Sequence, residues 1–389
     1  MKLKMKYTYY KVLVSLILFL GFLVNPSQAQ WKASFNLEQA FESNPFRFPN
    51  PAASAITIFD GGIQKDFESI SFSYVGSYSN FNQLADRNNY VHQFSVFNSD
   101  SNTELGLSLN QRFNGSEFDE YNYTIWDLFY SHSFNYDDYY FLFNANANYF
   151  NYALFSELDN LKFSGGLQIN KSFETKTTII TGLNLFFKNY INPYSVIIED
   201  TTQGMVPSAG GLGPGHNSAT SNDESSLSQL SFLFRLAQSV TTSTGLALQY
   251  QQRIFLSGAS RDISQYTMNY ADESLIFDDP MGYESSSFGA EITQLLPWKM
   301  MLKGAYYQTQ KEYSAQGIYL SEEIYDTSVF RSDTYTNSWI SLIKQFYIDH
   351  GDGIPMNLEF SYQLIDNTSN SYWYNYNNQV FNISLGLNF

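Results

Sequence analysis

The amino-acid sequence predicts an all-β fold: a closed, antiparallel, up-and-down β-barrel that spans a membrane with about 16 strands. Aromatic residues make up 18% of the 389 residues and charged residues only 15%, whereas soluble domains carry about 25% charged residues. Segments in which apolar and polar residues alternate recur from residue 31 to the end of the chain. Because successive side chains of a strand point to opposite faces, such segments would present an apolar face to lipid and a polar face to a lumen.

The first 29 residues have the features of a secretory signal peptide. Lysines at four of the first 11 positions precede an apolar run over 12–24, and small residues, Ser27 and Ala29, stand at −3 and −1 of a cleavage site after Ala29. The alternative, an uncleaved membrane anchor, fits less well because the run is shorter than the roughly 20 residues of a membrane-spanning helix. We therefore expect residues 30–389 to form one barrel.

Composition and charge exclude several classes of protein. The chain has no cysteine, which excludes disulfide scaffolds, thiol catalysis, Cys-based zinc sites and a lipid-anchored lipoprotein. Removing the four lysines of the signal peptide leaves 17 of the 21 basic residues against 37 acidic residues, a net charge of −20 rather than −16. This charge argues against nucleic acid as a partner.

Acidic residues in the longer connections predict a negative mouth of the barrel and a weak preference for cations. They are Asp200, Asp223, Glu224, Asp278, Asp279, Glu312, Glu322, Glu323 and Asp326.

Three segments show the alternation most clearly. Residues 381–389 place Phe, Ile and Leu on one face and Asn, Ser and Gly on the other. Residues 139–149 place aromatic residues and Ala opposite Asn, and residues 161–170 place Leu, Phe and Ile opposite Lys, Ser, Gln and Asn. In the core of a water-soluble sandwich such polar faces would be buried without water, but they are expected where a face lines water.

The strands and their connections follow from the same pattern. We expect strands at 31–41, 55–65, 68–80, 89–98, 103–113, 120–134, 138–151, 160–173, 177–190, 227–240, 244–256, 283–294, 298–310, 333–346, 354–365 and 377–389. The count is even, as single-chain bacterial barrels require, with roughly 14 or 18 strands as the alternatives. Connections after even-numbered strands are short, whereas those after odd-numbered strands are mostly longer, notably 191–226, 257–282 and 311–332. This alternation predicts periplasmic turns at one end and extracellular loops at the other.

The whole mature chain resembles Gram-negative outer-membrane β-barrel proteins of the porin-like kind. The last strand, Val380-Phe-Asn-Ile-Ser-Leu-Gly-Leu-Asn-Phe389, is similar to the C-terminal signal that these proteins present to the barrel assembly machinery. The resemblance implies that Phe389 is the assembly signal. It also implies a location in the cell outer membrane, among outer-membrane lipid and lipopolysaccharide.

A second resemblance covers the last hairpin. The segment Ile365-Asp-Asn-Thr-Ser-Asn-Ser-Tyr-Trp-Tyr-Asn-Tyr-Asn-Asn-Gln-Val380 is similar to the hairpin that closes barrels of the surface lipoprotein assembly modifier type. The helical repeats that precede those barrels are not found in this sequence, which argues against an export role.

Strand parity assigns a set of polar side chains to the lumen. They are Arg112, Asn144, Asn146, Lys162, Gln168, Lys188, Gln249, Arg253, Glu291, Lys299, Lys303 and Glu359. A barrel of about 16 strands is wide enough for an aqueous channel, and rings of such side chains set pore selectivity. The sequence therefore predicts an outer-membrane channel for passive passage of small polar solutes or ions. The alternative is a non-enzymatic assembly, secretion or adhesion component whose barrel is plugged.

The sequence predicts no enzyme, no metal and no cofactor. His92 and His132 fall in predicted strands, and neither has a serine two residues further on, where a nucleophile on the same face would lie. His216 and His350 fall in connections. Paired acidic residues recur in turns and loops, but no segment has the spacing of a calcium-binding loop.

Overall fold

The computed structural model describes residues 31–67, 70–192, 226–261, 279–348 and 353–389. The strands are β1 (Trp31–Glu42), β2 (Ser54–Phe67), β3 (Ile70–Phe81), β4 (Asn89–Ser99), β5 (Thr103–Asn114), β6 (Tyr123–Tyr136), β7 (Tyr139–Tyr152), β8 (Asn160–Ser172), β9 (Thr177–Tyr190), β10 (Ser226–Ser239), β11 (Thr244–Ser257), β12 (Tyr283–Leu296), β13 (Met300–Tyr313), β14 (Ile318–Tyr319), β15 (Tyr325–Asp326), β16 (Ser332–Ile348), β17 (Ile354–Ser369) and β18 (Tyr376–Asn388). The predicted signal peptide and most of the predicted connections 191–226 and 257–282 lie outside the described residues.

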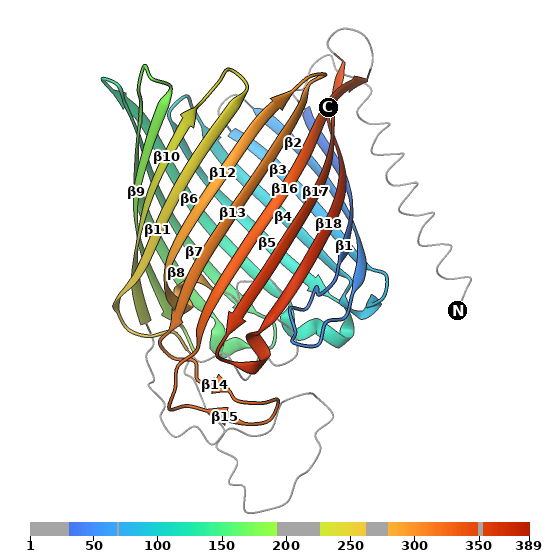
Figure 1. Ribbon diagram of the computed structural model, residues 1–389, viewed down its shortest axis with the longest axis vertical. Coiled ribbons are helices and arrows are strands. Elements are labelled where there is room, and N and C mark those ends of the chain that lie inside the picture. Colours follow the sequence, from blue (N-terminus) through green and yellow to red (C-terminus); the bar gives the residue numbers. More distant parts are fainter. Residues whose placement is uncertain (1–30, 68–69, 193–225, 262–278, 349–352) are drawn as a thin grey trace, which may run out of the picture.

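All of these strands except β14 and β15 form one closed antiparallel barrel of 16 strands (Figure 1). Each strand pairs with its neighbours in the chain, β13 pairs with β16, and β1 pairs with β18 to close the sheet. The all-β fold and the strand number predicted from the sequence are confirmed. We call the end with short connections the turn end and the opposite end the loop end.

The loop end carries short elements that the sequence pattern did not predict. Strands β14 and β15 pair through Ile318 with Asp326 and Tyr319 with Tyr325, and this hairpin projects beyond the barrel in Figure 1. It occupies the predicted loop 311–332. Strands of two residues are too short to show a hydrophobic period. Five short 3-10 helices also lie in described loop-end connections: η1 (Ala85–Arg87), η2 (Ser116–Tyr121), η3 (Ser156–Leu158), η4 (Pro280–Gly282) and η5 (Tyr372–Tyr374).

The turn end is built from tight hairpins. Asp100 lies between β4 and β5, and its carboxylate accepts hydrogen bonds from the backbone N–H groups of Asn102 (2.8 Å) and Thr103 (2.7 Å). These two hydrogen bonds lower the pKa of Asp100. Asp137, between β6 and β7, has a φ of 48°, a left-handed conformation that two-residue hairpin turns require and that Asp tolerates.

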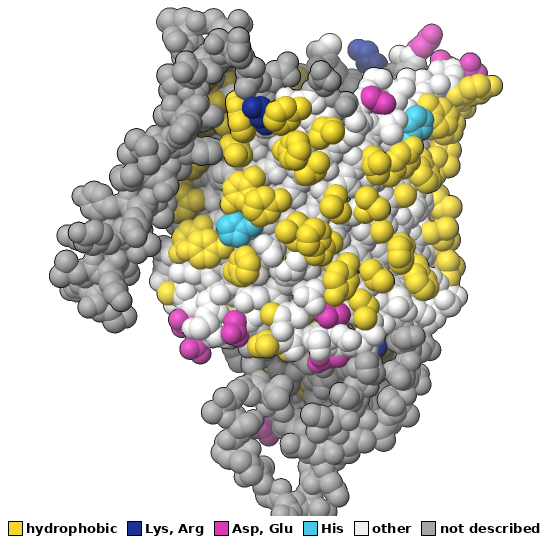
Figure 2. Space-filling model, turned by 180° about the vertical axis from the view of Figure 1, so that it is seen from behind, with side chains coloured by type: hydrophobic (Ala, Val, Ile, Leu, Met, Phe, Trp, Pro, Cys, Tyr) yellow, Lys and Arg dark blue, Asp and Glu magenta, His cyan; other side chains and the backbone are white. Residues whose placement is uncertain are grey.

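The outer wall is apolar, as strand alternation predicts for a face that meets lipid. Phe143 of β7, Leu185 of β9 and Phe288 of β12 expose 42%, 52% and 50% of their surface. Figure 2 shows apolar side chains spread over one side of the barrel, with acidic side chains near its two ends. A water-soluble protein rarely exposes so many large apolar side chains in one continuous area.

The barrel closes at a seam between the first and last strands. Leu37 of β1 is paired with Leu385 of β18. At the turn end Phe389 donates its N–H to the Ala33 carbonyl (2.8 Å), and Ala33 donates its N–H to the Phe389 carbonyl (3.2 Å). The last residue of the chain therefore adds the final rung of the closing ladder.

The register makes a prediction about neighbouring residues of β7. Phe143 belongs to the exposed apolar face and Asn144 to the opposite face. Replacing Phe143 with Arg should lower the free energy of unfolding by about 2–4 kcal/mol, because a charge would enter lipid near the bilayer midplane. Replacing Asn144 with Arg should change it little. Urea titration of barrels folded into phospholipid vesicles measures both, and the reverse order of the two losses would show that the register is wrong by one residue.

Candidate functional site: the inner wall and the loop end

Eleven of the 12 polar side chains assigned to the lumen lie within barrel strands, on the face opposite the exposed apolar residues. The register places Arg112 on β5, Asn144 and Asn146 on β7, Lys162 and Gln168 on β8, Lys188 on β9, Gln249 and Arg253 on β11, Glu291 on β12, Lys303 on β13 and Glu359 on β17. Lys299 differs, because the predicted strand 298–310 begins at Met300. Lys299 lies in the turn before β13 with a φ of 57°, and its Nζ is 4.6 Å from the centre of the Tyr347 ring.

Amide and hydroxyl groups line the inner face of β7, β8 and β9. Asn146 donates to Ser164 Oγ (3.4 Å), and Asn148 donates to the Asp127 carboxylate (2.5 Å). Opposite Asn144, Gly166 of β8 makes room for amide side chains of both neighbouring strands. A Cβ at this position would lie 2.0 Å from Asn184 Oδ1 and 2.8 Å from Asn144 Oδ1. The charged side chains of this part of the wall are Asp127 and, towards the loop end, Lys162 and Lys188.

Glu291 is held in an ion pair within the wall. Arg235 of β10 donates to both of its carboxylate oxygens, Nη1 to Oε1 at 2.7 Å and Nη2 to Oε2 at 2.6 Å, and the Tyr307 hydroxyl of β13 also donates to Oε1. Paired donors of this kind fix an Arg and a carboxylate in one plane. Arg235 therefore offsets the negative charge of Glu291.

Basic side chains gather on one side of the inner wall. Lys162 and Lys188 are direct partners in the β8–β9 ladder, and Arg253 lies near the loop end of β11. We call these three residues the basic sector. Lys188 is paired with Asp279, with 2.6 Å between Nζ and Oδ2, and its Nζ also lies 4.7 Å from the centre of the Tyr190 ring. Asp279 thus forms an ion pair with Lys188, and Lys162 also lies within electrostatic reach of its carboxylate.

Among the described residues, the structure corrects two of the predicted mouth acids: Glu312 lies within β13, and Asp279 lies against the barrel wall. The sequence placed Asp279 in an exposed loop, whereas its side chain is only 16% exposed and lies beside Lys188. Asp279 Oδ1 also accepts from the N–H of Met281 at the start of η4 (3.0 Å). Burial alone would raise the pKa of Asp279, but the charge of Lys188 outweighs it and holds the pKa below its ordinary value. The carboxylate is therefore ionised at neutral pH.

Acidic side chains gather on the other side. Glu38 of β1 lies within electrostatic reach of Asp60 of β2 and Glu359 of β17; we call these three the acidic sector. Asn36 donates to Asp60 (3.0 Å) and Ser341 to Glu359 (2.6 Å). In the strand order of the barrel, β17, β1 and β2 lie across from β8, β9 and β11. The two sectors therefore face each other across the lumen.

A buried arginine joins the β14–β15 hairpin region to the barrel. Arg331 pairs with Asp333 of β16, and its guanidinium carbon lies 4.1 Å from the ring centre of Tyr313 and 3.3 Å from that of Tyr374. Burial alone would lower the pKa of Arg331, but the charge of Asp333 outweighs it and raises the pKa. Nearby, the N–H of Tyr319 donates to Ser371 Oγ (2.9 Å). The hairpin is thus packed onto η5 rather than extended freely.

The two described histidines have partners on neighbouring strands. His92 Nδ1 lies 2.9 Å from the Tyr74 hydroxyl, and His132 Nδ1 lies 2.9 Å from Thr103 Oγ1. Neither partner is a serine, and both contacts join neighbouring strands of the barrel. His216 and His350 lie outside the described residues.

Glu38, Asp60 and Arg235 belong to this site and were missed by the sequence analysis, although parity could have found them. Glu38 lies between the outward residues Leu37 and Gln39, and Arg235 lies between Phe234 and Leu236. Asp60 follows the outward Phe59. Each therefore has the inward parity of its strand. Their pairings across strands carry no signal in a single sequence.

Among the residues that the structure describes, no group of three or more His, Cys, Asp or Glu side chains could hold a metal ion. Within that same part of the chain, no helix has both the length and the apolar character that crossing a membrane requires.

Comparisons with known proteins agree on the fold. No protein-family model matches the sequence, and no curated protein matches it. Among solved structures, OccAB1 of Acinetobacter baumannii matches with a TM-score of 0.52 and 10% identity, over 93% of this chain and 97% of that one. The outer membrane protein opdK of Pseudomonas aeruginosa matches with a TM-score of 0.50 and 8% identity, over 92% and 99%. The protein thus shares the barrel fold of a known outer-membrane protein.

The buried ion pair of the basic sector makes a prediction. Replacing Lys188 with Gln should lower the free energy of unfolding by about 3–5 kcal/mol, because Asp279 would remain as an unpaired buried charge. The double variant Lys188→Met/Asp279→Asn should lose less, because neither charge is then buried and Asn can still accept from Met281. Urea titration measures both, and a double variant that loses as much as Lys188→Gln alone, or more, would contradict the pairing.

The Lys188–Asp279 ion pair also determines how the stability of the folded protein depends on pH. The folded pKa of Asp279 lies below its ordinary value of 3.8. The stabilisation is therefore fully present above about pH 4 and is lost as the pH falls through the lowered pKa.

Proposed function

We propose that the protein is a channel of the outer membrane through which small polar solutes or ions pass passively. One observation carries this proposal: a closed barrel of 16 strands has an apolar outer face and a polar, charged inner face. Barrels of about 8 strands are filled by their own side chains, whereas porins of about 16–18 strands leave an aqueous channel. The residues assigned to the lumen would then line the pore.

The arrangement of charge supports passage of polar solutes. The basic sector and the acidic sector lie on opposite sides of the inner wall, and the walls themselves are of low dielectric constant. Charges of opposite sign across such a space produce a field that lies across the path of a solute. Solutes with a strong dipole would be oriented by this field.

The loop end would add a weak preference for cations. Glu322, Glu323 and Asp326 lie in the described β14–β15 region, and the chain without its signal peptide carries −20. A negative mouth concentrates cations within about 8–10 Å at physiological salt, and the effect is screened as salt rises. These acids would also suit bridges through divalent cations to lipopolysaccharide phosphates.

Ion selectivity gives the direct test of the charged wall. Replacing Lys303 with Gln should raise the cation preference, because it removes a cation from the lumen, whereas Glu359→Gln should lower it. Lys344→Gln is the matched control, since Lys344 lies on the outward face of β16. Reversal potentials of the wild type and the three variants in a salt gradient measure the effect. Clear anion selectivity of the wild type would contradict the predicted preference.

We also propose that Phe389 acts as the signal for the barrel assembly machinery. Deleting Phe389 removes both its ring and its backbone rung with Ala33, so the variant Phe389→Ala, which keeps the rung, separates the two. The yield of heat-modifiable folded barrel in the outer membrane should fall for the deletion and for Phe389→Ala, and should stay near the wild-type level for Phe389→Tyr. A wild-type yield for Phe389→Ala would mean that the rung matters and the aromatic signal does not.

A further inference from the structure

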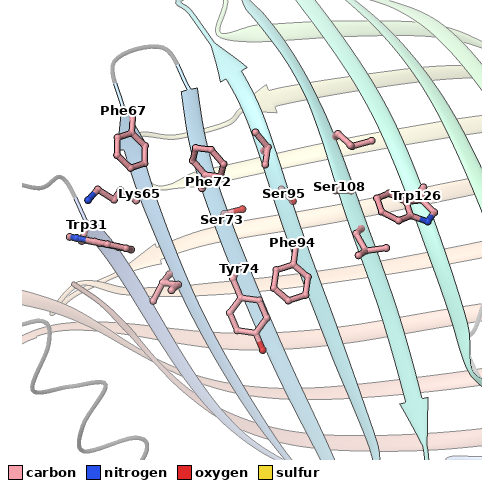
Figure 3. Close-up of a pocket in the computed structure, with 14 residues that line it drawn as sticks. Trp31, Lys65, Phe67, Phe72, Ser73, Tyr74, Phe94, Ser95, Ser108 and Trp126 are labelled. Carbon is pink, nitrogen blue, oxygen red and sulfur yellow. The ribbon is translucent and has the colours of Figure 1, made fainter.

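An apolar groove of about 490 Å³ crosses the outer wall from β1 and β2 to β6 (Figure 3). Its sides are mainly aromatic, formed by Trp31, Phe67, Phe72, Phe94 and Trp126. Ser73, Ser95 and Ser108 border its floor at positions whose side chains have the inward parity of their strands. The groove is thus a hollow in the surface that meets lipid.

The groove descends from the membrane surface into the apolar region. Lys65 and Phe67 lie close to the turn end of β2, whereas Trp126 lies near the loop end of β6. The pairing of the strands explains this change of depth. Lys65 lies opposite Phe72, and Phe72 lies opposite Val96, so the groove runs across the strands in the direction of their hydrogen bonds. Because barrel strands are tilted, a groove that crosses them at right angles changes its depth in the membrane. One end of the groove therefore lies at the level of lipid headgroups and the rest at the level of acyl chains.

A cation stands at the headgroup end. Lys65 Nζ lies 4.7 Å from the Trp31 ring centre and 4.8 Å from the Phe67 ring centre. On the opposite face of the sheet, the neighbouring Asp66 pairs with Lys32 at 2.9 Å. Within the described part of the chain, no carboxylate pairs with Lys65. An ammonium group held at the membrane surface in this way attracts an anionic lipid headgroup.

We propose that this groove binds an anionic glycerophospholipid of the leaflet at the turn end, with its phosphate on Lys65 and an acyl chain along Phe72, Phe94 and Trp126. The combination of a surface cation with an apolar hollow leading inward matches the two halves of a phospholipid. The proposal rests on the placement of the barrel in a membrane and is independent of whether the lumen conducts.

The chain offers a matched control for the groove. Lys171 lies near the turn end of β8, and its Nζ is 4.2 Å from the ring centre of Tyr139 and 5.4 Å from that of Phe173. It therefore shares the position and aromatic contacts of Lys65, but it does not border the groove. Comparison of the two lysines separates a specific site from a general attraction of basic residues to the membrane surface.

The test is native mass spectrometry of the purified folded barrel in detergent, titrated with phosphatidylglycerol. We expect one tightly bound phosphatidylglycerol, weaker binding of the zwitterionic phosphatidylcholine, and no binding of glycerol phosphate. Lys65→Gln should weaken phosphatidylglycerol binding about fivefold, as expected for one lysine at a membrane surface. Val96→Trp should weaken it by filling the groove with an apolar side chain that the lipid-facing wall tolerates.

Two results would overturn the proposal. Equal losses for Lys65→Gln and Lys171→Gln would show a general attraction without a site, and binding of glycerol phosphate as tight as that of the lipid would show that the groove takes no part. Heat-modifiability confirms that each variant is folded. Conductance of the same preparations reports the channel separately, so that loss of one property does not imply loss of the other.

Discussion

The structure depends on one constraint: within a membrane every backbone N–H and C=O group must find its partner inside the protein. An open sheet would leave two edges unpaired, so the sheet must close, and the pairing of β1 with β18 meets this requirement. The hydrogen bonds between Ala33 and Phe389 extend the closed ladder to the end of the chain. Closure in turn fixes which face of each strand meets lipid and which faces inward.

Closure also determines where charge can lie. The outward face must be apolar over the membrane, so most ionisable side chains within the strands point inward or lie near the ends of the barrel. Many of the inward charges lie in groups. Glu291 is paired with Arg235, whereas the basic and acidic sectors stay on opposite sides of the wall. The outward Lys65 stands near the turn end, where an anionic headgroup can reach it.

Much of this architecture follows from the sequence, because barrel strands leave a local signal of period two. The strand number and the inward positions of residues such as Asn144 and Lys162 follow from that period alone. Positions that depend on contacts between distant segments do not. Asp279 was expected in an exposed loop, yet it is buried against Lys188, which lies 91 residues earlier in the chain. Lys299 was expected on the wall, yet two left-handed residues place it in a turn. The β14–β15 hairpin is held by packing on η5, which no local pattern records.

The measurement that tests the central claim most directly is single-channel recording of the purified barrel in a planar bilayer, with heat-modifiability of the same preparation as proof of folding. An aqueous lumen predicts stepwise, ohmic conductance for every folded preparation. A folded barrel that inserts and yet conducts no ions would contradict the claim, and it would point to a plugged barrel that serves in assembly, secretion or adhesion.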